Sequence, residues 1–310
     1  MKEYLVGYTG FVGSNIVAKH EFTDLFNSKN IETAYGGNPD LLVYSGVRAE
    51  MFLANKDPEA DFATIEVALD NIKKINPKKL VLISSIAVYH NPDNVDEDAN
   101  INESNLSAYG KNRLYLEKQV RELYPNALIV RLPGLYGKNL KKNFIYDFIK
   151  RIPAMLSEEK YVELSAINKQ IQDSYMKQNN GFYKCKVLNV IEEQELKEIF
   201  ETIGFSALNF TDSRGTYQYY NLENLWKDIT LALENNIKLL NLAVEPVTAG
   251  ELYQYLTEQE FVNIINKPVP YFNYKTKYAS YFGGKNGYIK TKEEVLEDIK
   301  KYISEMKVTV

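Results

Sequence analysis

The feature that most constrains the fold is a glycine-rich segment near the start of the chain. Residues 3–6 form a short apolar run, and Gly7-Tyr8-Thr9-Gly10-Phe11-Val12-Gly13 follows it and opens an amphipathic stretch. Glycines between a strand and a helix permit a tight turn and let the backbone approach a bound group. The segment therefore predicts a strand–turn–helix unit that places a pyrophosphate at a helix N-terminus. An ordinary strand-to-helix turn is the alternative interpretation.

The first 130 residues alternate short apolar runs with longer amphipathic ones, which is typical of a parallel sheet with crossover helices. We expect strands at 3–6, 22–26, 41–44, 80–83 and 127–131, and helices at 11–19, 61–75 and 108–123. Later helices are expected at 143–152, 192–203, 222–235 and 292–306, with a short strand at 239–243. We predict an α/β protein with a doubly wound parallel sheet and a smaller mixed α/β lobe.

Composition argues against several other classes of protein. The 310 residues are 45% hydrophobic and 25% charged, with a net charge of −4, which is ordinary for a globular protein. A single cysteine, Cys185, and two histidines, His20 and His90, argue against disulfides and metal sites. No basic stripe favours nucleic acid, and no apolar run approaches the ~18 residues of a membrane span. The chain starts without a leader-like segment, so a cytoplasmic location is expected.

Four motifs in order resemble the extended short-chain dehydrogenase/reductases, a family of nucleotide-sugar epimerases, dehydratases and ketoreductases. The resemblance covers roughly the first 140 residues. The glycine-rich turn matches at Gly7, Gly10 and Gly13, with Phe11 and Val12 between them, and Tyr109 matches the tyrosine of Tyr-x-x-x-Lys. Ser84-Ser85-Ile86-Ala87-Val88-Tyr89 is similar to the serine motif at a strand end. Arg131-Leu132-Pro133-Gly134-Leu135-Tyr136-Gly137 looks like the segment beneath the nicotinamide.

The resemblance implies a Rossmann-like fold, an NAD(P) cofactor and specific catalytic roles. Tyr109 would be the acid/base and Ser85 the partner of the substrate oxygen, while Ser84 and Pro133 would contact the cofactor. Arg113 stands where the family has lysine. A guanidinium keeps the charge and can still donate to a ribose, but it is longer and planar. Ser84 is also interpreted as a serine that caps a local backbone group.

The segment after the second expected strand bears on the choice of cofactor. An acidic residue there would bind an unphosphorylated adenosine ribose, but the chain has Asn27-Ser28-Lys29. Neutral groups and a cation favour a 2′-phosphate, so the sequence leans towards NADP. A solvated loop lysine is an equally good interpretation of Lys29.

Residues near the expected site limit which reactions and which substrates the sequence predicts. The family's dehydratases resemble one another in an Asp-Glu pair directly after the catalytic hydroxyl residue. This chain has Ile86 and Ala87 at those positions. Neither side chain can act as an acid or a base, so dehydration is not expected. Gly134 replaces a substrate-binding asparagine, and no arginine starts the segment at 217–224. Arg214, Lys138, Lys141 and Lys142 are alternative phosphate ligands, and Tyr217, Tyr219 and Tyr220 either stack on a ligand or belong to a strand.

The leading hypothesis is a reductase or epimerase of a sugar or nucleotide-sugar carbonyl. Residues 1–140 would bind the dinucleotide, with part of the later chain returning to them, and residues 141–310 would mainly bind substrate. The alternatives are a non-catalytic dinucleotide-binding sensor or assembly protein and a reductase of a small non-sugar ketone. Leu114, Leu116 and Val120 form an apolar stripe that either pairs two copies in a homodimer or faces the sheet.

Overall fold

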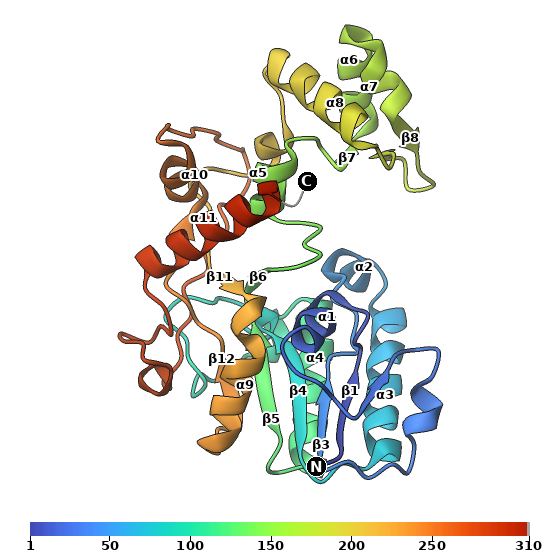
Figure 1. Cartoon of the computed structure of the whole chain (residues 1–310), viewed down its shortest axis with the longest axis vertical. Coiled ribbons are helices and arrows are strands. Elements are labelled where there is room, and N and C mark those ends of the chain that lie inside the picture. Colours follow the sequence, from blue (N-terminus) through green and yellow to red (C-terminus); the bar gives the residue numbers. More distant parts are fainter. Residues whose placement is uncertain (309–310) are drawn as a thin grey trace. The chain divides into compact units, whose positions relative to one another are not determined.

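The computed structural model describes residues 1–308 and divides the chain into two compact units (Figure 1). The first unit comprises Met1–Leu140, Thr216–Val247 and the chain from Pro270 onwards. The second comprises Lys141–Gly215 and Thr248–Val269. The later chain thus returns to the first unit twice.

The first unit is built on six parallel strands in the order β12-β5-β4-β3-β1-β2. They are β1 (Glu3–Val6), β2 (Asp24–Phe26), β3 (Leu41–Tyr44), β4 (Leu80–Ser85), β5 (Leu128–Leu132) and β12 (Leu239–Asn241). β1 pairs with β2 on one side and β3 on the other, so the strand order reverses at β1. Ligands of open α/β sheets bind at the carboxyl ends of the strands beside such a reversal. The predicted doubly wound parallel sheet is confirmed.

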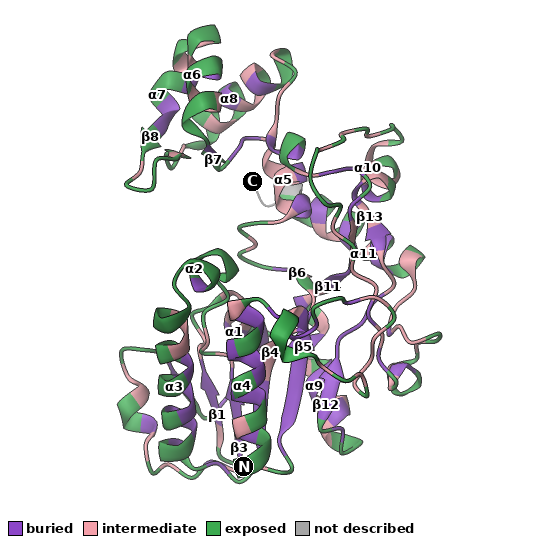
Figure 2. Ribbon diagram, turned by 180° about the vertical axis from the view of Figure 1, so that it is seen from behind, coloured by how far each residue is buried: buried purple, intermediate pink, exposed green. Residues whose placement is uncertain are grey.

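Helices cover both faces of this sheet. α3 (Pro58–Ile75) and α4 (Ala108–Leu123) lie side by side on one face, and α1 (Phe11–Val17) and α9 (Leu225–Glu234) on the other (Figures 1 and 2). α3 begins with an Asp57 cap and a proline at its first position, and it buries Ile65, Leu69 and Ile72 at helical spacing. These residues pack on the apolar strands and form the main core (Figure 2).

The predicted elements of the first unit agree closely with the structure. The strands at 3–6 and 41–44 and the helix at 108–123 have the predicted bounds. The other predicted strands differ by one to two residues at an end, and the stretch at 222–235 divides into a 3₁₀ turn, η5 (Leu222–Asn224), and α9. The sequence analysis did not predict α2 (Met51–Lys56), which is short and exposed.

The other elements of the first unit are short, except for the long helix α11. They are η1 (Ile31–Ala34), η2 (Ile86–Val88), η3 (Glu103–Asn105), β6 (Gly134–Tyr136), β10 (Thr216–Tyr217), β11 (Tyr219–Asn221), β13 (Val247–Thr248, which ends in the second unit), η6 (Ala279–Phe282) and α11 (Lys292–Val308). β6 continues from β5 after Pro133 and pairs with β11 in parallel. No helix among residues 1–308 is long and apolar enough to span a membrane.

The second unit combines helices with a three-stranded antiparallel sheet of order β7-β9-β8. Its elements are α5 (Phe144–Lys150), β7 (Met155–Leu156), α6 (Glu158–Ile167), α7 (Lys169–Ser174), β8 (Tyr175–Lys177), β9 (Tyr183–Cys185), α8 (Val190–Thr202), η4 (Ala207–Phe210) and α10 (Ala249–Thr257). Buried Leu156, Leu164, Leu196 and Phe200 belong to its core. The predicted mixed α/β lobe is confirmed.

The apolar stripe on α4 faces the first unit's own interior. Leu116 and Val120 belong to the main core, and Leu114 belongs to a second buried cluster with Val88. These side chains are at most 5% exposed, so the interpretation in which they face the fold agrees with the structure. A homodimer stays a prediction and would need other residues at its interface.

Candidate functional site

The glycine-rich turn lies where the strand order reverses. Gly7 has a φ of +91°, and a Cβ there would lie 2.6 Å from the carbonyl oxygen of Ser45, immediately after β3. A Cβ on Gly13 would lie 2.2 Å from the Gly7 oxygen. Both positions therefore require glycine. Gly10 caps α1, whose first residues are Phe11 and Val12, so the predicted strand–turn–helix unit is present.

Ser45 is a residue of this turn that the sequence analysis missed. Its hydroxyl donates to the carbonyl oxygen of Val6 over 2.9 Å, and its backbone N–H donates to the same oxygen. These bonds join the end of β3 to the end of β1. The only signal in the sequence was its position directly after an apolar strand.

Asn27, Ser28 and Lys29 follow the second strand, as expected. The Asn27 side-chain oxygen accepts the backbone N–H of Lys29 over 2.9 Å, which closes a local turn. The side chains of Ser28 and Lys29 are exposed. The turn thus presents a hydroxyl and an ammonium group to solvent beyond the end of β2.

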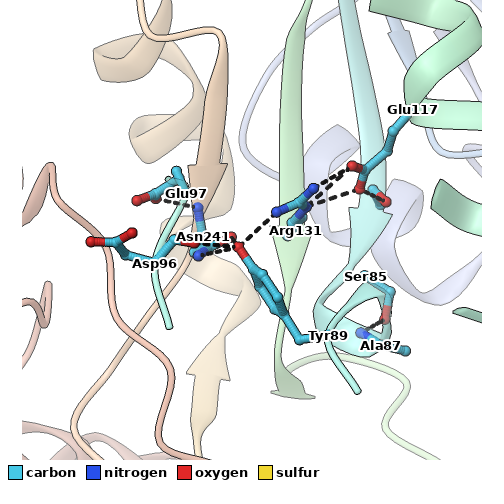
Figure 3. A network of polar contacts seen from close by, with 9 residues as sticks. Ser85, Ala87, Tyr89, Asp96, Glu97, Glu117, Arg131 and Asn241 are labelled. Carbon is cyan, nitrogen blue, oxygen red and sulfur yellow. Dashed lines mark hydrogen bonds and ion pairs between the residues drawn. The ribbon is translucent and has the colours of Figure 1, made fainter. Parts of the chain in front are cut away.

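The two serines at the end of β4 have different surroundings. Ser85 caps η2, and its oxygen accepts the backbone N–H of Ala87 over 3.2 Å (Figure 3). The Ser85 hydroxyl proton remains able to donate to a ligand. Ser84 donates its hydroxyl proton to Glu117 of α4 over 2.6 Å. The partner is a side chain of α4 and not the local backbone group that the capping interpretation expected, so this contact gives Ser84 a structural role of a different kind.

Glu117 belongs to a buried polar network between α4 and the strand ends (Figure 3). Arg131 of β5 donates through Nε and Nη2 to Glu117, at 3.0 and 2.6 Å. Its Nη1 donates to the Tyr89 hydroxyl over 2.7 Å, and that hydroxyl donates to the backbone oxygen of Asp96. Burial raises the pKa of Tyr89, which keeps this hydroxyl protonated and able to donate. An arginine inside an apolar strand was the sequence signal for a buried counter-ion.

Tyr109 lies in the first turn of α4, beside the turn that follows Ser85. Ser107 caps the helix by accepting the Gly110 backbone N–H. A Cβ on Gly110 would lie 2.3 Å from the carbonyl oxygen of Ala87, so glycine lets α4 contact η2 directly. Ser85 and Tyr109 thus border the same turn although they are 24 positions apart in the sequence. Tyr109 is 5% exposed, and its backbone N–H donates to Asn55.

Arg113 has an ion-pair partner in α3. Its Nη1 and Nη2 donate to the two carboxylate oxygens of Asp61, at 2.7 and 3.1 Å, and Nη2 also donates to the carbonyl oxygen of Arg48. Its guanidinium carbon lies 4.1 Å from the centroid of the Tyr109 ring. Sequence reasoning missed Asp61 because 52 residues separate it from Arg113. The ribose contact of Arg113 stays a prediction.

The segment expected beneath the nicotinamide runs from β5 through Pro133 into β6. Gly134 pairs with Tyr219 of β11, and a Cβ on Gly134 would lie 2.8 Å from the carbonyl oxygen of Gln218. The close approach of β11 therefore explains why an asparagine does not stand at this position. Tyr219 and Tyr220 are buried, which favours their interpretation as core residues of a strand.

The second unit places Arg214 against an acid. Its Nε and Nη2 donate to Asp212 at 2.9 and 2.7 Å, and these bonds hold the pKa of Asp212 well below its usual range. Lys141 and Lys142 are exposed, as is Arg214 despite its pairing with Asp212.

A protein-family model, described as the NAD dependent epimerase/dehydratase family, matches residues 19–170. The matched segment is just under half of the chain, and it confirms the resemblance for these residues. The match contains Ser85, Tyr109 and Arg113, while the glycine-rich turn precedes it. The family match, together with solved structures of epimerases and reductases that have the same fold, agrees with the class of NAD(P)-dependent enzyme that the resemblance implied. A search of curated protein sequences found no match.

Solved structures of the same fold cover almost all of the chain. UDP-N-acetylglucosamine 4-epimerase from Methanobrevibacter ruminantium M1, in complex with UDP-N-acetylmuramic acid, has 13% identity and a TM-score of 0.63, over 100% of this chain and 99% of that one. WbmG from Bordetella bronchiseptica, with NAD and UDP, has 15% identity and a TM-score of 0.61, over 92% and 88%. The dTDP-4-dehydrorhamnose reductase of Bacillus anthracis, with NADP, has 14% identity and a TM-score of 0.62, over 98% of both chains.

Proposed function

We propose that the protein is an NAD(P)-dependent reductase or epimerase that acts on the carbonyl of a sugar or a nucleotide-linked sugar. The observation that carries this proposal is the packing of α4 on η2. Gly110 meets the Ala87 carbonyl oxygen, and this contact brings Tyr109 and Ser85 to the same turn at the carboxyl end of β4. A phenol and a serine hydroxyl at one strand end suit the polarisation and protonation of a carbonyl.

In this proposal Tyr109 gives a proton to the substrate oxygen during reduction and removes one in the reverse direction. Ser85 donates a hydrogen bond to the same oxygen, because its own oxygen already accepts the Ala87 N–H. Arg113 supplies a cation against the face of the Tyr109 ring. Ile86 and Ala87 carry no acid or base, so the site is not arranged for loss of water.

The first unit has residues that fit a dinucleotide. Gly7 and Gly13 form a turn that a Cβ would obstruct, at the reversal of strand order, and α1 begins at this turn. Asn27, Ser28 and Lys29 suit the adenosine ribose, and the exposed Lys29 favours a 2′-phosphate, hence NADP. Ser84 near the end of β4 and Pro133 directly after β5 are assigned to contact the cofactor in this proposal. When bound, the cofactor supplies a hydride donor or acceptor.

Support for a sugar-nucleotide substrate comes from the family match and from relatives of the same fold. The Methanobrevibacter epimerase is in complex with a UDP-sugar, and the Bacillus enzyme is named as a reductase of a dTDP-sugar. The choice between reduction and epimerisation follows from the cofactor: a lean towards NADP favours reduction. A small non-sugar ketone is the alternative substrate, since Gly134 cannot act as a substrate-binding asparagine.

The test is a fluorescence titration of the protein with NADH and NADPH, followed by absorbance at the nicotinamide band with keto-sugars and small ketones. Binding with substrate-dependent loss of absorbance supports a reductase and identifies its substrate class. Constant absorbance with conversion of a nucleotide sugar to its epimer supports an epimerase. A protein that binds neither dinucleotide contradicts the proposal.

A non-catalytic dinucleotide-binding protein is the second candidate. The observation that favours it is the pairing of Arg113 with Asp61, because this cation is already neutralised by a carboxylate. Such a protein would bind a dinucleotide and convert none of the substrates offered. Binding without consumption of cofactor and without any epimer would support this candidate.

A further inference from the structure

Asp61 is a nearly buried carboxylate in the first turn of α3, and the proposed reaction does not use it. Its side chain is 10% exposed, and that of Arg113 is 5% exposed. Besides both Arg113 nitrogens, the carboxylate accepts the side-chain N–H of Asn112 over 2.8 Å. Three donors from α4 therefore fix the position of Asp61.

The pair also fixes Arg113 relative to Tyr109. A guanidinium that binds both oxygens of one carboxylate has a defined plane, unlike an ammonium group, which acts as a point charge. The Arg48 carbonyl oxygen accepts a further bond from the same guanidinium. These acceptors hold the guanidinium over the Tyr109 ring, at 4.1 Å from its centroid, where a cation is attracted to the ring face.

The segment after β3 links Arg113 to the glycine-rich turn. Gly7 contacts Ser45 and Gly46, and Arg48, which accepts the Arg113 bond, follows two residues later. The charge of Arg113 would attract an anion bound at the turn, and the charge of Asp61 opposes that attraction. Both charges are nearly buried, so salt screens them less than it screens surface charges.

We propose that Asp61 is a positioning residue that holds Arg113 against Tyr109 and, by cancelling the charge of Arg113, limits the affinity of the site for an anionic dinucleotide. This inference rests on the proposed function, because the dinucleotide is its ligand. It makes Arg113 and Asp61 one functional unit: the arginine at the lysine position comes with its own counter-ion.

The experiment measures the Kd of the full chain for NADH and NADPH by fluorescence titration, with thermal unfolding of each variant. Asp61→Asn keeps the size of the side chain and removes its charge, so Kd should fall about threefold or more. Arg113→Met should raise Kd by a similar factor, and the double variant should return to the wild-type value. Asp61→Glu restores the charge and should keep the wild-type Kd.

Asp70→Asn is the matched control, because Asp70 is an exposed acid of the same helix that pairs with Lys74. Its Kd should not change. Two results would show that the Asp61–Arg113 pair only joins α3 to α4: equal Kd values for Asp61→Asn and Asp70→Asn, or a rise in Kd in every Asp61 and Arg113 variant. Either result would overturn this inference and leave the proposed function standing. Should Asp61→Asn fail to fold, a comparison of Arg113→Met with the double variant still shows whether removing the charge of Asp61 lowers or raises Kd. A wild-type protein that binds neither dinucleotide overturns the proposed function and this inference together.

Discussion

The two units differ in how they accommodate buried charge. In the first unit, α4 carries Arg113 and Glu117, and each has a partner of opposite charge within hydrogen-bond distance, Asp61 and Arg131 respectively. In the second unit, α5 carries Asp147, whose pKa burial alone raises to about 7. Paired carboxylates keep their charge inside a protein, whereas a carboxyl group that is merely desolvated tends to keep its proton.

This difference shows where the fold provides fixed charge. The pairs of the first unit join α4 to α3 and to β5, at about one and two turns along the helix from the candidate acid Tyr109. Breaking a pair should therefore affect stability or catalysis in the first unit, whereas removing Asp147 should relieve a cost in the second.

The largest effect is expected at Tyr109, which the charge of Arg113 faces. Tyr109→Phe removes the hydroxyl that the proposal assigns to proton transfer, and the rate should fall by about 10²-fold or more, with the Kd for cofactor nearly unchanged. Steady-state kinetics with the substrate found in the screen measure this. Tyr115→Phe on the exposed face of α4 is the control and should have wild-type activity. Normal turnover of Tyr109→Phe would show that another group transfers the proton.

The next effect is on stability. Arg131→Met leaves the buried Glu117 without its partner, and the free energy of unfolding should fall by about 3–5 kcal/mol, because an uncompensated buried charge is costly. Urea denaturation measures the loss. A double variant, Arg131→Met with Glu117→Leu, should recover most of it. Lys118→Met, also on α4, breaks an exposed pair with Glu103 of η3 and should change the free energy of unfolding little. A loss no larger than that of Lys118→Met would contradict the role of the network.

Replacing Asp147 should stabilise the protein, in contrast to the loss of stability expected for Arg131→Met. The carboxyl pKa is 3.8 in the unfolded chain and about 7 in the folded one, so between these pH values unfolding releases a proton and becomes more favourable as pH rises. Asp147→Asn cannot ionise and should raise Tm by about 2 °C at pH 8, with no gain near pH 4. Thermal unfolding at both pH values measures this. Asp173→Asn, an exposed acid of the same unit, is the control, and a gain independent of pH would contradict the assignment.

Arg113→Lys tests how much of the first pair depends on geometry. An ammonium group keeps the charge but cannot bind both oxygens of Asp61 in one plane. Activity should stay within about threefold of wild type or rise, since the charge near Tyr109 persists. Lys111→Arg on the exposed face of the helix is the control. A loss comparable to that of Tyr109→Phe would mean that the planar guanidinium itself is required.

The smallest effect is expected at the exposed turn after β2. Lys29→Ala should raise the Kd for NADPH by about threefold and leave that for NADH unchanged, because a solvated cation contributes a modest attraction to a 2′-phosphate. Parallel titrations with both cofactors measure the ratio. Lys79→Ala, which alters another exposed lysine, should change neither value. An equal rise in Kd for NADPH and NADH would contradict the predicted preference for NADP.

The sequence determined the framework of the first unit. The apolar run Leu41–Tyr44 is too short for a helix and too apolar for a surface, so the bounds of this strand could be predicted from the sequence. Ser107 marks the start of α4, and the glycine-rich turn at Gly7–Gly13 marks the start of α1. The positions of Ser85 and Tyr109 in a candidate site followed from motif order alone.

The tertiary structure decided which charges face one another. Asp61 and Glu117 look like ordinary helix acids in the sequence, and their arginine partners lie 52 and 14 residues away. No local period relates such pairs, because they form where separate helices and strands pack. The sequence alone was enough to predict candidate acid/base and cofactor-binding residues. Only tertiary packing determined that Arg113, beside Tyr109, is paired with Asp61.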